Sequence, residues 1–384
     1  MGRLEEEKGS SGERTSIRLG ILGSGQLALM LAEAAAKLGI STTLFSEDLE
    51  NDVAREEFFS ASDLVIFESD FLPFSSLRNL EFQKYCPELA VIEKLSDKIR
   101  QKEILRSLQI PSPHFEVLGK DKKIDLWIED NYRRFPRGCV FKWSRGGYDG
   151  KGVQLSNGKS GEDRDFIVAG LQKNSDIFCE ERIEFVRELS QISAFSKTKD
   201  WAYYPLVISE QEKGICRNVF GPAKNFGVSE LIQVGLQSAA KKLGELLELY
   251  GVFAIEAFEL KDGGFAVNEI APRVHNTGHF SLNFSAISQF ENHLRAVTGM
   301  KLGATESTQN FYMRNVLGDR LAFLESAPKA TLPPGWHFKW YNKNEVRRGR
   351  KLGHLNFGGF KATELQALRE LAAGLELQIL NSLR

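Results

Sequence analysis

The sequence predicts an N-terminal α/β domain followed by a mixed α+β region. Three observations lead to this expectation. Near the N-terminus a strand, a glycine turn and a helix at 17–38 begin a βαβ unit. From about residue 115 the pattern changes to strands and hairpins. At 251–269 an Asp-Gly pair between two alternating apolar runs predicts a long antiparallel hairpin.

The N-terminal elements follow in order along the chain. They are strands at 17–22, 42–45 and 63–67, a helix at 26–38 ended by Gly39, and a helix at 97–108 capped by Ser96-Asp97. Pro111-Ser112-Pro113 then forces an extended linker, where we place a domain transition. Glu68 and Asp70 follow the third strand, at the edge where α/β sheets bind ligands. Either carboxylate is a candidate substrate contact, and a solvated strand end is the alternative.

The glycine turn after the first strand matches a dinucleotide-binding pattern. Gly23, Gly25 and Ala28 fit G-x-G-x-x-A, and Glu47 stands about twenty residues further on, as in a nicotinamide-cofactor fold. Backbone N–H groups at the helix start can face an anion. The alternative is a tight turn that packs the helix on the sheet and binds no dinucleotide. The motif by itself leaves both interpretations open.

Composition excludes several classes of protein. Fifty basic and fifty-one acidic residues in a chain of 384 give a net charge of -1, which disfavours general nucleic-acid binding. The four cysteines are far apart in sequence and form no C-x-x-C pair, as expected for a reducing cytoplasm. No run approaches the roughly eighteen apolar residues of a membrane-spanning helix. Residues 1–16 are charged and Gly/Ser-rich, and we expect a disordered tail there.

A glycine-rich loop lies between expected strands at 138–143 and 152–155, with further strands expected at 176–181 and 189–195. Its glycines let the backbone approach a ligand closely, and Lys142, Arg145 and Lys151 add positive charge. This composition is typical of a phosphate-cradling loop. Because a strand and not a helix follows, the loop would cover a nucleotide as a hairpin flap. A solvated glycine hairpin is the alternative.

The expected hairpin at 251–269 places two carboxylates face to face. If Asp262-Gly263 is a two-residue loop, or the centre of a symmetric four-residue one, Glu256 lies directly opposite Glu269. Like charges about 5 Å apart repel, and the apolar flanks make water a poor screen. A divalent cation held by both resolves the conflict, and Mg²⁺ with carboxylates and phosphate oxygens is the usual arrangement. Asn268 can add an oxygen if a bulge turns it inward. A shared proton or an exposed hairpin is the alternative.

Two further clusters carry groups that bind anions. Directly after the hairpin, Arg273, His275, Asn276 and His279 stand in a proline-broken loop, with His275 the stronger functional candidate. A second cluster at 343–354 contains five arginines and lysines in a turn. A charge run at a turn is usually a solvated face, and an anion pocket is the alternative.

Eight segments together resemble the N5-carboxyaminoimidazole ribonucleotide synthetases, which belong to the ATP-grasp superfamily. They are GSGQLALM, SDKIRQK, FKWSRGGYDGKG, CEERIEFVRELS, AIEAF, NEIAPRVHNTGH, SQFENHLRAVTG and EVRRGRKLGHLN, in the family's order from about residue 17 to 360. NEIAPRVHNTGH and RRGRKLGHLN are far more specific than the glycine motifs.

The resemblance implies an ATP-grasp fold of α/β and α+β type, with an N-terminal Rossmann-like domain and a small C-terminal β-rich domain. The implied boundaries are a tail at 1–16, the N-terminal domain at 17–112, the ATP-grasp domain at 113–305 with a flap lobe at about 113–185, and the C-terminal domain at 306–384. It implies a cytoplasmic ligase, a homodimer, with small-molecule substrates, no nucleic acid and no membrane. ATP, with Mg²⁺, phosphorylates bicarbonate, and the carboxyphosphate or its CO₂ carboxylates 5-aminoimidazole ribonucleotide.

The resemblance also implies residue roles. For ATP they fall on Lys98, Lys142, Gly147, Tyr148, Asp149, Gly150, Lys151, Gly152, an adenine hinge of Glu180, Glu181, Arg182 and Ile183, the ribose ligand Glu188, and Asn268 and Glu269. The metal falls to Glu256 and Glu269, in agreement with the hairpin register. The implied catalytic residues are Tyr148, Lys151, Arg273 and His275. The remaining ribonucleotide contacts are Glu68, Asn276, Lys343, Arg350 and Lys351.

Some positions depart from the family's usual pattern, and other functions therefore remain as alternatives. Ala28-Leu29 stands where Gly-Arg is usual, Lys98 where Arg is common, and Phe195 where a basic residue is usual. One alternative is an ATP-grasp ligase with a different acceptor or donor. Another is a nucleotide-binding relative that no longer catalyses. A nicotinamide oxidoreductase would leave the Glu256/Glu269 pair unexplained.

Overall fold

The computed structural model of the protein describes residues 17–45, 51–78, 80, 82, 84–147, 150–324, 327–328 and 331–383. Three expectations fall outside these ranges: the tail at 1–16, Glu47, and the loop residues Tyr148 and Asp149.

The N-terminal part is a three-stranded parallel sheet of order β2-β1-β3 with helices around it. Its elements are β1 (Arg18–Leu22), α1 (Gln26–Lys37), β2 (Ser41–Phe45), α2 (Asp52–Ser60), β3 (Leu64–Phe67), α3 (Phe74–Arg78), α4 (Leu89–Leu95) and α5 (Lys98–Ser107). The predicted βαβ start is confirmed. Asp97 caps α5, because its carboxylate accepts hydrogen bonds from the N–H groups of Ile99 and Arg100.

A small lobe follows, built on a four-stranded antiparallel sheet of order β4-β7-β5-β6. Its elements are β4 (Phe115–Val117), α6 (Ile124–Arg134), β5 (Cys139–Trp143), β6 (Val153–Leu155), α7 (Ser160–Gln172) and β7 (Ile177–Glu181). Side chains alternate along a strand, and Phe141 and Cys179 pack with Trp127 of α6 and Ile167 of α7. Lys142 and Glu180, one position along, therefore point to the opposite face.

The largest element is a nine-stranded sheet of order β13-β12-β8-β10-β11-β14-β18-β16, with β9 paired to β8. Its strands are β8 (Phe185–Phe195), β9 (Trp201–Tyr203), β10 (Val207–Glu212), β11 (Ile215–Gly221), β12 (Gly251–Leu260), β13 (Phe265–Ala271), β14 (Phe311–Leu317), β16 (Trp336–Trp340) and β18 (Lys351–Gly358). Strand β8 begins four residues earlier than expected, because it pairs with β12 from Phe185 onward. A two-stranded sheet pairs β15 (Ala322–Phe323) with β17 (Glu345–Val346).

Helices cover both faces of the nine-stranded sheet. They are α8 (Glu230–Leu247), α9 (Ser281–Phe284), α10 (Gln289–Thr298) and α11 (Leu365–Asn381), with short 3-10 turns at η1 (Ala223–Phe226), η2 (Asn276–Gly278) and η3 (Ala362–Glu364). α8 and α11 pack on the face that carries Phe253, Ile255 and Leu355. α10 packs on the opposite face, against Val252 and Ala254, and α1 packs against α10. The predicted domain boundaries stay predictions, and β14, β16 and β18, which follow residue 306, belong to the same sheet as β8–β13.

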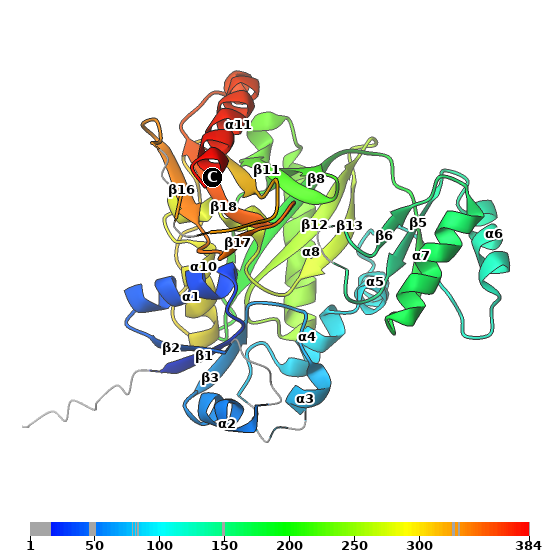
Figure 1. Cartoon of the computed structure of the whole chain (residues 1–384), viewed down its shortest axis with the longest axis horizontal. Coiled ribbons are helices and arrows are strands. Elements are labelled where there is room, and N and C mark those ends of the chain that lie inside the picture. The colour runs from blue at the N-terminus through cyan, green and yellow to red at the C-terminus, as the bar shows by residue number, and fades with distance from the viewer. Residues whose placement is uncertain are drawn as a thin grey trace, which may run out of the picture.

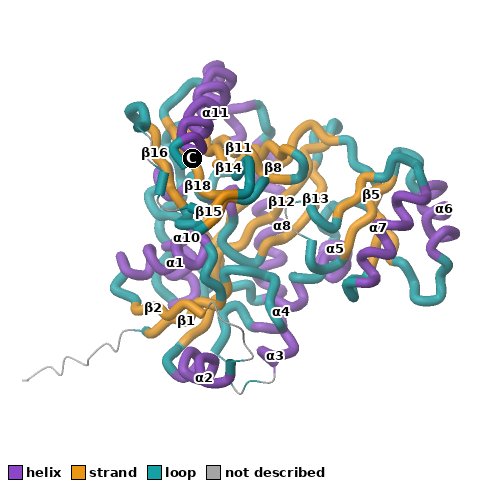
Figure 2. The backbone as a smooth tube through the Cα atoms, in the orientation of Figure 1, coloured by secondary structure: helices purple, strands orange, loops and turns teal. Residues whose placement is uncertain are grey.

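Figure 1 shows how these parts are arranged. The small lobe with α6 and α7 projects to the right of the nine-stranded sheet, and the N-terminal domain lies below it. α5 lies between the small lobe and the strands β12 and β13, and the tube in Figure 2 shows the same placement. Two short connections join the small lobe to the rest, at 111–114 and 182–184. Groups from the small lobe and from the nine-stranded sheet therefore meet on the faces of β5 and β13 that are turned toward α5.

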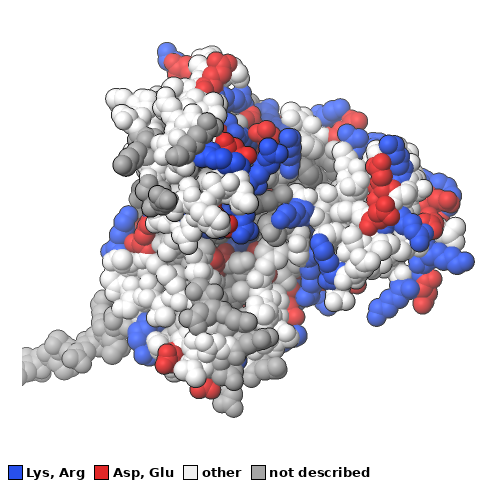
Figure 3. Space-filling model, in the orientation of Figure 1, with Lys and Arg blue, Asp and Glu red and all other residues white. Residues whose placement is uncertain are grey.

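The surface shows no large field of one sign on the face drawn in Figure 3. Lys and Arg side chains lie beside Asp and Glu side chains over the small lobe and around α11. This agrees with the near-zero net charge. Within the described residues, no helix is both long and apolar enough to cross a membrane.

Candidate active site

The paired carboxylates lie on the β12–β13 hairpin, on the face of the sheet away from α8. Glu256 is the register partner of Glu269, as predicted. The predicted turn is wrong: the loop is Lys261-Asp262-Gly263, since the Leu260 N–H donates to the Gly264 carbonyl at 2.9 Å. A three-residue loop shifts the register by one, and a bulge that leaves Asn268 unpaired shifts it back. Because Val267 and Ile270 both face α8, the bulge leaves Asn268 and Glu269 on the opposite side.

The two carboxylates have different electrostatic partners. Lys98, at the start of α5, places its ammonium 2.6 Å from Glu269 Oε2. Burial opposes the charge on Lys98, yet Glu269, Glu256 and Asp70 together outweigh it, and the pKa of Lys98 is raised. Glu256 contacts the ring of His275, with Oε1 3.3 Å from Nε2. Burial, and then repulsion from Glu269 and Glu188, raises the pKa of Glu256 to about 7.

This carboxylate chemistry suits a hard divalent cation. A positive charge between Glu256 and Glu269 would relieve the repulsion that raises the pKa of Glu256. Asn268, turned to the same side, can add a neutral oxygen. A cation would compete with Lys98 for one oxygen of Glu269. The described residues hold no group of three or more His, Cys, Asp or Glu side chains that could bind a metal by themselves, so further oxygen ligands would come from outside the protein.

Glu256 gives a pH dependence of stability whose sign can be worked out. Its pKa rises from the ordinary 4.5 to about 7 on folding. Between these values only the folded chain holds the proton, so the free energy of unfolding falls as pH rises from 4.5 to 7. Without divalent cations we expect a loss of about 3 kcal/mol over this range. Denaturant unfolding in EDTA at both pH values measures it. The Glu256→Gln variant should lack this component, and an equal slope in the variant would contradict the assignment.

A second buried network joins the small lobe to β13. The Lys142 ammonium lies 2.5 Å from Glu180 Oε2 and donates to Asn268 Oδ1 at 3.1 Å. Lys102 of α5 binds the other Glu180 oxygen at 2.8 Å and donates to the Val267 carbonyl at 3.3 Å. Burial lowers the pKa of Lys102 to about 8, although Glu180 opposes the shift. Burial works against the Glu180 carboxylate, but the two ammonium groups keep its pKa below the ordinary value.

The glycine-rich loop lies between β5 and β6 and reaches toward the large sheet. A Cβ atom on Gly150 would come within 3.1 Å of Gly214 Cα, in the turn between β10 and β11. A Cβ on Gly147 would meet the Lys151 carbonyl at 2.5 Å, and Gly152 has a positive φ of 72°. The loop therefore needs its glycines to fold tightly and to touch the opposite lobe. Lys151, on the same loop, is exposed.

The predicted adenine hinge forms the connection from the small lobe to β8. The N–H groups of two hinge residues donate hydrogen bonds within the small lobe. Glu181 donates to the His114 carbonyl and Arg182 to the Gly138 carbonyl, each at 2.9 Å. The side chain of Glu181 pairs with Arg137, away from the carboxylate pair. Ile183 is half-buried. Glu188 lies on β8 next to Phe258, and burial raises its pKa.

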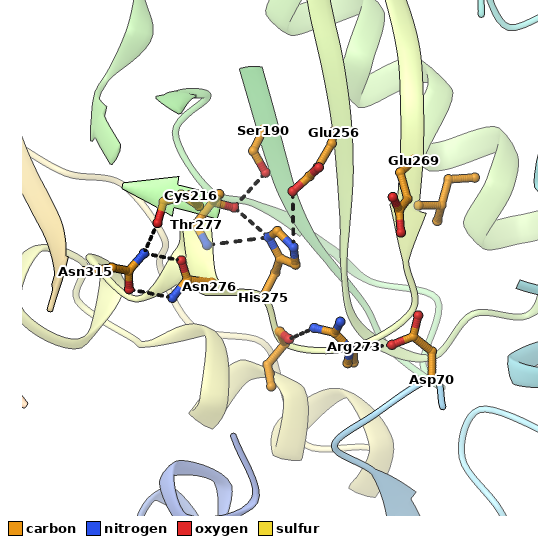
Figure 4. Close-up of polar contacts among 12 residues, drawn as sticks. Asp70, Ser190, Cys216, Glu256, Glu269, Arg273, His275, Asn276, Thr277 and Asn315 are labelled. Carbon is orange, nitrogen blue, oxygen red and sulfur yellow. Dashed lines mark hydrogen bonds and ion pairs between the residues drawn. The ribbon is translucent and has the colours of Figure 1, made fainter. Parts of the chain in front are cut away.

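The loop after β13 carries Arg273, His275 and Asn276 to the same face. Figure 4 shows the His275 ring between Glu256 and Thr277. The amide of Gln289 brackets the His275 backbone, accepting from its N–H at 2.9 Å and donating to its carbonyl at 2.7 Å. Burial, with Arg273 nearby, lowers the pKa of His275 to about 3, so the ring is neutral. Asn276 exchanges two hydrogen bonds with Asn315 of β14, at 2.9 and 2.6 Å.

Arg273 ties this loop to the N-terminal domain. Its Nε donates to Asp70 Oδ1 at 2.8 Å, a contact drawn in Figure 4. Burial opposes both charges, but each charge is stabilised by the other, so the pKa of Asp70 is lowered and that of Arg273 raised. Asp70 is therefore no solvated strand end. It orients a guanidinium beside the two carboxylates.

Glu68 fills the glycine turn of the N-terminal domain. Its two oxygens accept from the N–H groups of Gly25 at 2.7 Å and Ala28 at 2.9 Å, at the start of α1. A Cβ on Gly23 or Gly25 would fall within 2.2 or 2.7 Å of Glu68 atoms. The glycines thus make room for this carboxylate, and the helix N-terminus already has its anion. The turn offers no site for a dinucleotide pyrophosphate, which removes the basis of the nicotinamide alternative.

The cationic cluster of the C-terminal region faces the same side. Burial, and then Arg350, lowers the pKa of Lys343, while Glu68 opposes the shift. Arg350 pairs with Glu345 at 2.9 Å. Lys351 lowers the pKa of Glu256 and of His275 by its charge. Lys343, Arg350 and Lys351 are therefore partly buried near Glu68 and the carboxylate pair, whereas Arg347 and Arg348 of the same cluster are exposed.

The structure adds four residues that the sequence analysis missed: Lys102, Gln289, Thr277 and Ser190. All four lie within segments that carry the family resemblance, but the resemblance assigned them no role. Lys102, Gln289 and Thr277 contact predicted site residues directly, and Ser190 is the register partner of Glu256. Cross-lobe pairing of Lys102 with Glu180 could have been suspected only from a lysine on a predicted buried helix face.

Comparison with known proteins decides the family. Residues 103–290 match the ATP-grasp domain, and residues 312–368 match the phosphoribosylaminoimidazole carboxylase C-terminal domain. The N5-carboxyaminoimidazole ribonucleotide synthase of Saccharolobus solfataricus is 32% identical over 361 residues, which cover 91% of this chain and 93% of that protein. The chain belongs to the N5-carboxyaminoimidazole ribonucleotide synthase family.

Solved structures of this family have the same fold. The enzyme from Thermus thermophilus has a TM-score of 0.78 at 31% identity and covers 94% of this chain and 98% of that one. The enzyme from Aspergillus clavatus complexed with ATP has a TM-score of 0.81 at 26% identity and covers 95% and 99%. The predicted ATP-grasp fold is confirmed. The chain is an enzyme of a family of ATP-dependent ligases.

Proposed function

We propose that this protein carboxylates 5-aminoimidazole ribonucleotide with bicarbonate at the expense of ATP, in purine biosynthesis. A bicarbonate oxygen attacks the γ-phosphorus and ADP leaves, which forms carboxyphosphate. The amine nitrogen then attacks the carboxyl carbon, phosphate leaves, and the nitrogen loses a proton. The carbamate product is N5-carboxyaminoimidazole ribonucleotide. The proposal rests on one observation. Glu256 and Glu269 lie side by side, with cations from two lobes on one side and the Arg273–His275 loop on the other.

The residues on the small-lobe side suit a nucleotide. We infer that Lys98 and Lys142 turn from their carboxylates to the ATP phosphates, with the loop residues Gly147–Gly152 over them. The hinge at 180–183 would hold the adenine and Glu188 the ribose hydroxyls. A bound Mg²⁺ would supply positive charge at the phosphates, and Glu256, Glu269 and Asn268 are the residues that would hold it. A closed loop also protects carboxyphosphate from water.

The residues on the other side suit the ribonucleotide and bicarbonate. Tyr148, Lys151, Arg273 and His275 are proposed to contact the reacting groups, where the guanidinium and the ring stabilise negative charge during transfer. Lys343, Arg350 and Lys351 would bind a 5'-phosphate. Asn276 and Glu68 would orient the substrate, since each Glu68 oxygen keeps a lone pair beside the N–H it accepts. We also propose a cytoplasmic homodimer, on the family resemblance.

The decisive experiment measures phosphate release from Mg·ATP and bicarbonate with and without 5-aminoimidazole ribonucleotide. We expect release only when all three substrates are present, with one carbamate formed per phosphate. Release that is unchanged by the ribonucleotide would point to a different acceptor. ATP binding without release under any of these conditions would show a relative that no longer catalyses.

A further inference from the structure

A chain of hydrogen bonds leads from the interior of the sheet to His275. Ser190 Oγ lies 2.7 Å from Thr277 Oγ1, and that hydroxyl lies 2.8 Å from His275 Nδ1. On its other side the ring reaches Glu256 Oε1 at 3.3 Å from Nε2. Figure 4 shows the four side chains in this order. Ser190 on β8 is also the register partner of Glu256 on β12, so both ends of the chain stand on neighbouring strands.

The backbone N–H of Thr277, which can donate a hydrogen bond but cannot accept one, sets the direction of these bonds. The backbone N–H of Thr277 points at His275 Nδ1, at an N···N distance of 3.4 Å, as the ring caps the turn η2. A backbone N–H only donates, so Nδ1 carries a lone pair and no proton. The Thr277 hydroxyl then also donates to Nδ1 and accepts from Ser190. The ring proton is left on Nε2, facing the Glu256 carboxylate.

Both hydroxyls are committed to this arrangement. Ser190 and Thr277 are completely buried, so no bulk water competes for their hydrogen bonds. Gln289 holds the His275 backbone from the other side, which keeps the ring over Glu256. A protonated ring would place an N–H against the Thr277 N–H, which this geometry disfavours.

We propose that Thr277, supported by Ser190, is a positioning residue that holds His275 as the Nε2–H tautomer, so that the ring donates a hydrogen bond to an anionic oxygen and accepts no proton there. In the resting protein Nε2 faces Glu256 Oε1. In turnover, which rests on the proposed function, the anionic oxygen belongs to bicarbonate or to the carboxyphosphate formed from it. The ring then stabilises negative charge in the manner of an oxyanion-binding group.

The tautomer can be observed without any substrate. In full-length protein labelled with ¹⁵N-histidine, the signals of His275 are identified by their loss in His275→Asn. We expect an unprotonated Nδ1 and a protonated Nε2 in the wild type. Thr277→Val keeps the shape and the backbone N–H but removes the hydroxyl. With only the longer 3.4 Å contact left at Nδ1, it should shift the Nδ1 signal and populate part of the Nδ1–H tautomer, while Thr277→Ser keeps the wild-type pattern. A wild-type ring with the proton on Nδ1 would overturn the proposal.

Steady-state kinetics with Mg·ATP, bicarbonate and 5-aminoimidazole ribonucleotide gives the second readout. Thr277→Val is expected to lower kcat about 10²-fold while the KM for ATP stays within a factor of two or so. Thr277→Ser should restore most of the rate, and Ser190→Ala should fall between the two. Equal kcat in Thr277→Val and wild type, with the tautomer changed, would overturn the catalytic part. If the wild type lacks ribonucleotide-dependent turnover, the proposed function fails and the tautomer result still stands.

Discussion

Glu269→Gln is expected to abolish turnover, with a fall in kcat of at least about 10³-fold, while the fold stays intact. The amide keeps the size of the side chain and can still accept from Lys98, but it removes half of the charge offered to a divalent cation. Repulsion across the hairpin is relieved as well, so the raised pKa of Glu256 should fall toward its ordinary value. Phosphate release measures the first effect, and the pH slope of stability in EDTA measures the second.

Asp262→Asn is the matched control, because it makes the same change of charge at the exposed turn of the same hairpin. Asp262 Oδ1 accepts from the Gly264 N–H at 2.9 Å, and an amide oxygen can replace it. This variant should retain wild-type turnover. Wild-type turnover in Glu269→Gln would refute the assignment of a metal to this pair.

Arg273→Met is expected to lower both stability and activity. The substitution leaves Asp70 as a buried carboxylate without its guanidinium, which costs about 3 kcal/mol in the free energy of unfolding. Turnover should fall about 10²- to 10³-fold because a cation beside the reacting groups is lost. Denaturant unfolding and phosphate release give the two values separately.

A double variant separates these two effects. Arg273→Met with Asp70→Asn removes both charges, so most of the lost stability should return while turnover remains low. Arg18→Met, which breaks the exposed pair of Arg18 with Asp63, is the control for an arginine lost from a contact of the N-terminal domain and should change little. Recovery of turnover together with stability in the double variant would show that Arg273 acts only on the fold.

The hairpin shows how far local sequence rules reach. Alternation and an Asp-Gly pair predict two strands and, by counting outward, the pairing of Glu256 with Glu269. The pairing is confirmed, but two deviations cancel: the loop has three residues, and the bulge at Asn268 restores the register. The three-residue loop leaves no mark in the hydrophobic pattern, whereas the bulge does, since the apolar residues Val267 and Ile270 on one face are three positions apart and not two. Here Lys142 of β5 donates to the amide that the bulge turns inward.

Local sequence rules could not predict the contacts between elements that are far apart in the chain. Lys102 and Glu180 are far apart in sequence and meet because α5 lies between the two lobes. Asp70 and Arg273 come together because the N-terminal sheet ends against the loop after β13. The sequence predicts each of these carboxylates as an isolated candidate, and only the tertiary arrangement supplies its cation. The resemblance to a known family predicted most of the site residues, but it did not indicate which of them neutralise one another.

The path of the nine-stranded sheet has a consequence for how the protein is made. β11 is bonded on its outer side to β14, and β14 in turn to β18, so the sheet is finished by strands from the last part of the chain. During synthesis the backbone N–H and C=O groups along the outer side of β11 stay unpaired until those strands leave the ribosome. A chain that stops near residue 305 would keep this edge and should associate through it. The C-terminal segment is thus part of one cooperative folding unit and cannot be exchanged like a separate module.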